Sequence, residues 1–125
     1  MCPAWSCHKD VSSLVRRAPA NAQWISCGNY FQAIPFLSGQ RAVVVAGTGE
    51  LAYGRDHLDP RERERWFQED LLSFTATALR LRAEAPDRPV WALVDRHACR
   101  DLPAAQRQAW ALNDAAPACV LVALQ

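Results

Sequence analysis

The sequence predicts an α/β fold with the order β-β-α-β-α-β, in which a four-stranded mixed, mostly parallel sheet carries two main helices. Two observations lead to this prediction. Apolar runs recur at residues 41–46, 90–95 and 118–124, and runs without polar alternation are typical of strands covered on both faces. Helical patterns fill the stretches between these runs, and a helical crossover joins parallel strands in the right-handed sense.

Composition places the chain among globular proteins and excludes two classes of partner. The 125 residues have the length of one domain, and 50% are hydrophobic and 22% charged. A net charge of +1 offers no bulk attraction to nucleic acid or to an anionic membrane. No apolar run approaches the roughly 20 residues that span a bilayer. We therefore expect neither a membrane nor a nucleic-acid partner.

The cysteines predict a reducing compartment. There are five, an odd number, at Cys2, Cys7, Cys27, Cys99 and Cys119. The N-terminus lacks a basic segment followed by an apolar core of the signal-peptide type, so we expect a cytoplasmic protein with reduced thiols. Cys2, Cys7 and His8 lack the paired spacing of metal ligands, so we expect no metal and no cofactor, and their role stays open.

Residues 1–22 are expected to form a weakly structured lead-in, with a helical turn at Val11–Arg17, before a single domain over residues 23–125. Residues 23–36 have the aromatic and β-branched content of strands. Gly28 and Asn29 form either the turn of a hairpin or a bulge in one long strand. We favour one strand, paired antiparallel with the next run, because an edge position tolerates Pro35.

A long helix is predicted from Asp59 to about Ala85. Asp59 suits the N-cap, Pro60 the first helical position, and Glu62 completes a capping box, while Pro86 ends the helix. One apolar stripe should lie on the sheet: Phe67, Leu71, Phe74, Ala78 and Leu81. A second, smaller stripe faces another direction: Leu72, Ala76, Leu79 and Ala83. This second stripe either packs on a neighbouring helix or forms a subunit interface.

The second half of the chain should add a strand, a helix and a last strand. The helix is expected to be capped near Asp101, with Pro103 in its first turn and with Ala105, Ala109 and Leu112 as a narrow apolar stripe. Two helices cannot cover both faces of such an apolar sheet. The N-terminal segment, a second subunit or a missing part of a longer protein should cover the remainder.

Candidate site residues lie where two predicted strands end, since ligands of parallel α/β sheets bind beyond the carboxyl ends of the strands. The first end supplies Thr48, Glu50, Tyr53, Arg55, Asp56 and His57, and the second supplies Asp95, Arg96, His97 and Cys99. A histidine beside a carboxylate could act in acid–base chemistry, Cys99 could be a nucleophile beside His97, and Arg55 could hold an anion. The alternative is that these residues are polar only because loops at strand ends are exposed to solvent.

A glycine pattern at the end of the central run resembles the dinucleotide-binding turn. Gly47, Thr48, Gly49 and Ala52 match G-x-G-x-x-A. The fingerprint requires the turn to open a helix directly, whereas the helix here begins at the later Asp59 cap. We interpret the match as accidental.

Short strings of the chain resemble a known family. Gly49-Glu50-Leu51 at a strand end, a long helix, VWALVD at residues 90–95, a polar turn and a Pro-Ala-Ala helix are similar to the SpoIIAA-like STAS domain, over residues 42–124. The resemblance implies a bacterial regulatory binding module rather than an enzyme. Residues 97–102 read HACRDL and offer no hydroxyl where the family is phosphorylated, so such a switch is not expected.

Two hypotheses follow. The first is a non-catalytic regulatory or protein-interaction module whose partner is another protein or a second copy. The second is a small ligand-binding protein or enzyme acting on a phosphate- or nucleotide-containing ligand at the strand ends, with Thr48, Arg55, His57, Asp95 and His97 as its site.

Overall fold

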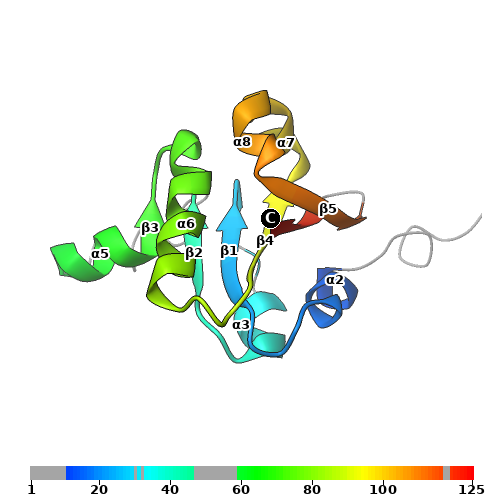
Figure 1. Cartoon of the computed structure of the whole chain (residues 1–125), viewed down its shortest axis with the longest axis horizontal. Helices are drawn as coiled ribbons and strands as arrows, with labels where there is room; N and C mark the ends of the chain where they lie inside the picture. The colour runs from blue at the N-terminus through cyan, green and yellow to red at the C-terminus, as the bar shows by residue number, and fades with distance from the viewer. Residues whose placement is uncertain (1–10, 30, 32, 47–58, 117–118) are drawn as a thin grey trace, which may run out of the picture.

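The computed structural model describes residues 11–29, 31, 33–46, 59–116 and 119–125. It has the predicted α/β class, but the sheet has six strands rather than four, in the order β3-β2-β1-β4-β6-β5 (Figure 1). The strands are β1 (Gln23–Cys27), β2 (Ala42–Val45), β3 (Phe67–Gln68), β4 (Val90–Asp95), β5 (Trp110–Ala115) and β6 (Cys119–Leu124). The described helices are α2 (Val11–Arg17), α3 (Ala33–Ser38), α5 (Pro60–Trp66), the 3-10 turn η2 (Leu71–Ser73), α6 (Phe74–Glu84), α7 (Arg96–Asp101) and α8 (Ala104–Gln108).

The predicted antiparallel pairing of the first two strands is wrong, because β1 and β2 run parallel. Gly28 and Asn29 form neither a hairpin turn nor a bulge; they follow the end of β1 and lead into a crossover that contains α3. Pro35 lies in the first turn of α3, where a backbone N–H has no intrahelical partner to lose. The helix therefore accepts the proline that suggested an edge strand.

The predicted long helix is interrupted after Trp66. Asp59 does cap its start, since the carboxylate accepts a hydrogen bond from the Glu62 N–H at 3.0 Å, and α6 ends at Glu84 as expected. Between these points the chain extends as β3, which pairs with the end of β2. Asp70 then caps η2 by accepting from the Leu72 N–H at 2.9 Å. A second N-cap inside the helical pattern restarts the helix.

The segment predicted as the second helix is two short helices followed by a strand. The predicted cap near Asp101 is wrong, because Asp101 is the last residue of α7 and Asp95 caps that helix. Residues from Trp110 onward form β5, which pairs antiparallel with β6, and β6 pairs antiparallel with β4. The last run is thus a strand as predicted, but its expected parallel direction is wrong. Trp110 accounts for the change, because its ring stacks on Phe74 at 4.4 Å between centroids and anchors β5 beneath α6.

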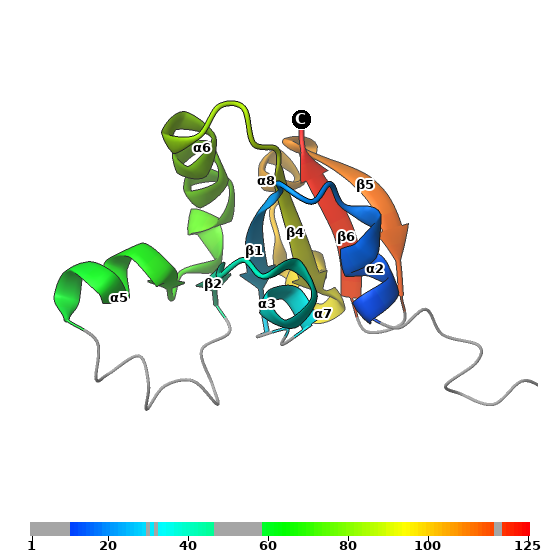
Figure 2. The same cartoon turned by 90° about the horizontal axis from the view of Figure 1, so that it is seen from below.

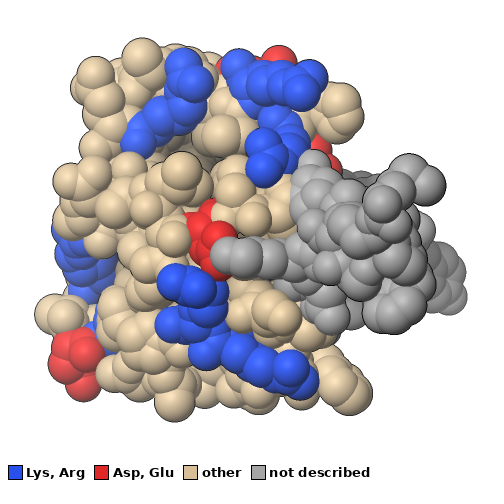
Figure 3. Space-filling model, turned by 90° about the vertical axis from the view of Figure 1, so that its right-hand side faces the viewer, with Lys and Arg blue, Asp and Glu red and all other residues tan. Residues whose placement is uncertain are grey.

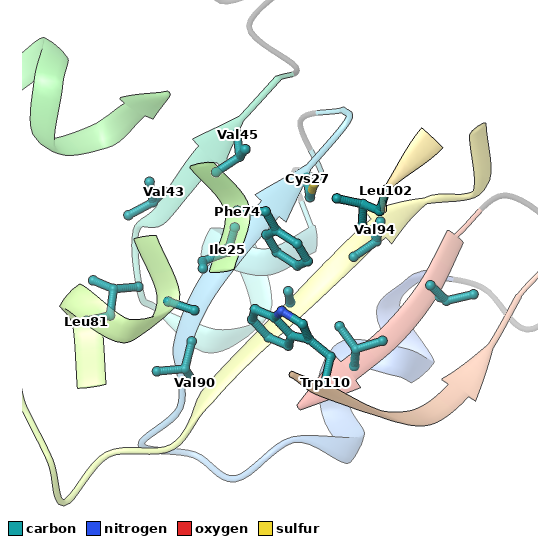
Figure 4. Close-up of a cluster of buried hydrophobic side chains, with 14 residues drawn as sticks. Ile25, Cys27, Val43, Val45, Phe74, Leu81, Val90, Val94, Leu102 and Trp110 are labelled. Atoms are coloured by element: carbon teal, nitrogen blue, oxygen red, sulfur yellow. The ribbon is translucent and has the colours of Figure 1, made fainter. Parts of the chain in front are cut away.

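Both faces of the sheet are covered by this chain. On one face Phe74, Ala78 and Leu81 of α6 pack with Leu102 and Trp110 (Figure 4). On the other, α2 and α3 lie together over β1, β4 and β6 (Figure 2). Their buried side chains on that face are Leu14, Val15 and Ile34. The N-terminal segment, one of three coverings considered, therefore contributes α2 to this second face.

Candidate functional site

The first half of the predicted strand-end site falls outside the described residues. These candidates are Thr48, Glu50, Tyr53, Arg55, Asp56 and His57. Within the described chain, Val45 ends β2 and Ala46 follows with a left-handed φ of 55°. Whether the loop carries ligand-binding groups stays a prediction.

The two strand ends lie at one edge of the sheet but are not adjacent. β1 separates β2 from β4, so the ends are two strand spacings apart, about 10 Å. Gly28, directly after β1, lies against the first turn of α7. A Cβ on Gly28 would come within 3.0 Å of the Asp95 Cβ and still closer to that of Ala98. The end of β1 therefore packs closely against the start of α7 and leaves no room there for a side chain.

Asp95 and His97 do not form an acid–base pair through their side chains. The Asp95 carboxylate caps α7 by accepting a hydrogen bond from the backbone N–H of His97 at 2.9 Å. The His97 side chain is exposed. Arg96 turns away to donate from Nε to the Ala116 carbonyl at 2.6 Å. At the end of β4, the side chains of Asp95 and Arg96 therefore form hydrogen bonds with backbone groups.

Two buried thiols near this edge, Cys27 and Cys119, are held in their protonated form. Burial, with smaller contributions from the nearby Cys99 and Asp95, raises the pKa of Cys27 to about 12. Burial likewise raises the pKa of Cys119 to about 11, against the opposing effect of Arg96. Neither buried thiol is a nucleophile near neutral pH. Among the residues that the structure describes, no three His, Cys, Asp or Glu side chains group as metal ligands.

An apolar cavity of about 220 Å³ lies between the sheet and the α7–α8 pair, and sequence reasoning missed it. Its wall contains Phe74, Val94, Cys99, Leu102, Arg107, Trp110, Leu112, Val120 and Val122. These residues come from six separate elements, so no local pattern signals the cavity. Of the predicted site residues that the structure describes, only Cys99 contributes to its wall.

A second missed hollow lies at the amino ends of the parallel strands. There two guanidinium groups lie over the ring of Trp66, with Cζ of Arg41 at 4.3 Å and Cζ of Arg65 at 5.3 Å from the ring centroid. Arg65 is paired with Glu84 at 3.1 Å, and Arg88 donates to the Asn21 carbonyl at 2.8 Å. Because these cations already have partners, the hollow holds no ready anion site.

The second stripe of the predicted helix is exposed along its length. We call Leu72, Ala76, Leu79 and Ala83 the outer α6 face, although Leu72 lies in the preceding turn η2 and only the other three lie on α6 itself. Leu72 and Leu79 are 54% and 50% exposed, and both alanines are exposed as well. The neighbouring helix α8 contacts α6 elsewhere, since the Gln106 side chain accepts a hydrogen bond from the Thr75 N–H at 3.1 Å. Packing on a neighbouring helix therefore does not cover this stripe.

Charge on the β5 side of the molecule is grouped. Figure 3 shows Lys and Arg side chains at the end where α7 and α8 lie, with acidic side chains beside them and a further basic stretch lower on the same face. Those two helices carry Arg96, Arg100 and Arg107 together with Asp101. A positive potential at that end would favour an anion approaching the molecule there.

Comparisons of the chain with protein-family models, with curated proteins and with solved structures each find no match. None of the helices in the described residues is long and apolar enough to cross a bilayer. Function must therefore be argued from the geometry itself.

Proposed function

We propose that this protein is a non-catalytic interaction module that self-associates through the outer α6 face. The supporting observation is the exposure of this stripe, with Leu72 and Leu79 at least half exposed. The sheet does not need the stripe for its own core, because Phe74, Ala78 and Leu81 already cover that face. Apolar side chains aligned on one exposed helix face are typical of a surface that packs against another helix.

The spacing of the outer α6 face favours a second copy as the partner. The four residues follow one another at intervals of four, three and four, which is the seam of a paired helix. In an antiparallel pair related by a two-fold axis between residues 77 and 78, Leu72 would meet Ala83 of a second copy. Ala76 would likewise meet Leu79. Each large side chain then faces a small one, as a self-complementary interface requires.

The catalytic hypothesis receives no support from the described half of its site. Asp95 is used as a helix cap, and His97 is exposed without a side-chain bond to it. The phosphate- or nucleotide-directed alternative depends on residues 47–58 and stays a prediction. So does the STAS-like type, although the parallel β1–β2 pair and the interrupted helix differ from the order on which that resemblance relied.

Light scattering after size-exclusion chromatography tests self-association. Over a rising concentration series, we expect the mass to increase from 13.9 kDa toward twice that value. Leu79→Glu places two buried charges at the centre of the predicted contact, so its dissociation constant should rise at least about tenfold. Circular dichroism should be unchanged, because Leu79 is exposed in the single chain.

Phe36→Glu is the matched control. Phe36 is 86% exposed and lies on α3, against the opposite face of the sheet from α6. This variant adds the same charge at an exposed apolar position and should associate like the parent. A monomer at every concentration, or equal dissociation by both variants, would contradict the proposal.

A further inference from the structure

We propose that the apolar cavity between the sheet and the α7–α8 pair binds a small aromatic carboxylate, with its ring inside and its acid group at Arg107. The residues that line the cavity do not belong to the outer α6 face. This proposal therefore stands or fails independently of self-association.

The volume of the cavity suits one aromatic ring with a short tail. An apolar cavity of about 150 Å³ is enough to bind benzene and stays dry when empty. The cavity here measures about 220 Å³. Its floor is formed by Val94, Val120 and Val122, which offer no hydrogen bond to water. A ring that enters buries its apolar surface against these side chains.

One wall of the cavity is aromatic and held in place. The rings of Phe74 and Trp110 stack with an interplanar angle of 1°. The Trp110 indole N–H donates to the Thr75 hydroxyl at 3.3 Å. Gln106 ties α8 to the start of α6 by donating from Nε2 to the Leu72 carbonyl at 3.0 Å. A planar ligand can therefore pack on the edge or face of a preformed aromatic pair.

Arg107 supplies the recognition of charge. Arg107 and Leu112 line the cavity and are also exposed, whereas Trp110, Leu102 and Val94 are buried, so the first two mark the mouth. Within the described residues, the Arg107 guanidinium has no hydrogen bond or ion pair. A carboxylate at the mouth could accept two parallel N–H bonds from this planar group while remaining hydrated on its other side. An apolar body with one anionic end thus matches both parts of the site.

An NMR titration with two probes tests both parts. The probes are 3-phenylpropionate and the uncharged 3-phenylpropan-1-ol, which share the ring and differ in the end group. The signal to follow is the Trp110 indole N–H, assigned by its loss in Trp110→Phe. We expect both probes to shift this signal in saturable fashion, and the acid to bind about tenfold more tightly than the alcohol, as one charge-assisted contact allows.

Two exposed positions provide variants that leave the core intact. Arg107→Gln should abolish the roughly tenfold advantage of the acid and leave the alcohol unchanged. Leu112→Trp should weaken both probes by narrowing the mouth, since Leu112 is 68% exposed at its rim. No saturable shift at Trp110 with either probe would overturn the cavity as a site. An acid advantage that persists in Arg107→Gln would overturn the assignment of Arg107.

Discussion

Gly28 shows at the scale of one residue how closely the end of β1 packs against the start of α7. Its φ is +80°, a conformation that costs other residues about 1–2 kcal/mol, and its missing side chain leaves room for Ala98. Gly28→Ala should therefore lower the free energy of unfolding by about 3 kcal/mol, from backbone strain and overlap combined. Urea denaturation measures the loss.

Gly39 provides the control for this prediction. Its φ is +69°, but a Cβ there would meet nothing within 4 Å. Gly39→Ala should cost only the conformational part, about 1–2 kcal/mol. Equal losses in the two variants would show that close contact with α7 does not matter at Gly28.

Cys27 carries a pH dependence whose direction follows from burial. In the unfolded chain the thiol titrates at its ordinary pKa of 9.0, whereas the folded protein holds its proton up to about pH 12. Its contribution to stability is therefore complete below pH 9 and is lost as the pH rises from 9 toward 12.

Comparison with Cys27→Ala isolates this contribution from other titrating groups. Above pH 9, the difference in unfolding free energy between the parent and Cys27→Ala should shrink by about 1.4 kcal/mol per pH unit. Urea denaturation at pH 8, 9.5 and 10.5 measures it. If the unfolding free energies of the parent and of Cys27→Ala changed in parallel with pH, the thiol would not be buried in its protonated form.

At the scale of elements, the end of α6 is tied to β1 through one side chain. Gln23 is buried, and its Nε2 donates to the carbonyls of Leu81, Ala85 and Arg88 at 2.9, 3.4 and 3.3 Å. The Leu81 and Ala85 carbonyls also accept from the backbone N–H groups of Ala85 and Arg88, so this amide adds a second donor at the end of α6. Strand and helix are thus joined by polar as well as apolar contacts.

Removal of this amide should weaken the attachment of α6 to β1 and lower the free energy of unfolding. Gln23→Ala removes the side-chain donor from three carbonyls, of which those of Leu81 and Ala85 keep a backbone donor, and should cost about 1–3 kcal/mol of unfolding free energy. Gln108→Ala changes an exposed glutamine at the end of α8 and should stay within about 0.5 kcal/mol of the parent. Thermal and urea unfolding of both variants would show the contrast. A Gln23→Ala variant as stable as Gln108→Ala would exclude this stabilising role.

The boundaries of the helices and strands show which sequence signals predicted the structure correctly. Asp59, Pro60 and the stop before Pro86 act through bonds within a few residues, and all three mark the observed ends. The apolar stripe across residues 67–81 predicted a continuous helix, whereas Phe67 and Gln68 are extended as β3. Pairing with β2 decides that conformation, and the partner strand is more than 20 residues away.

For the molecule as a whole, the arrangement of layers explains why two surfaces remain for binding. α2 and α3 cover one face of the sheet, and α6 with α7 and α8 covers the other (Figures 1 and 2). The two groups on the second face do not close completely over the sheet. The cavity lies beneath α7 and α8, and the outer α6 face points away from the core.

The sequence by itself determined the α/β class, the apolar runs of β2, β4 and β6, the Asp59 cap of α5, the end of α6 before Pro86 and the amphipathic pattern of α6. These features depend on side chains near in sequence. Only the tertiary structure decided the parallel direction of β1 and β2, the strand at Trp110 and the walls of the cavity. Strand direction depends on which crossover the chain completes, and a cavity depends on residues from six elements, so neither is encoded in any single stretch.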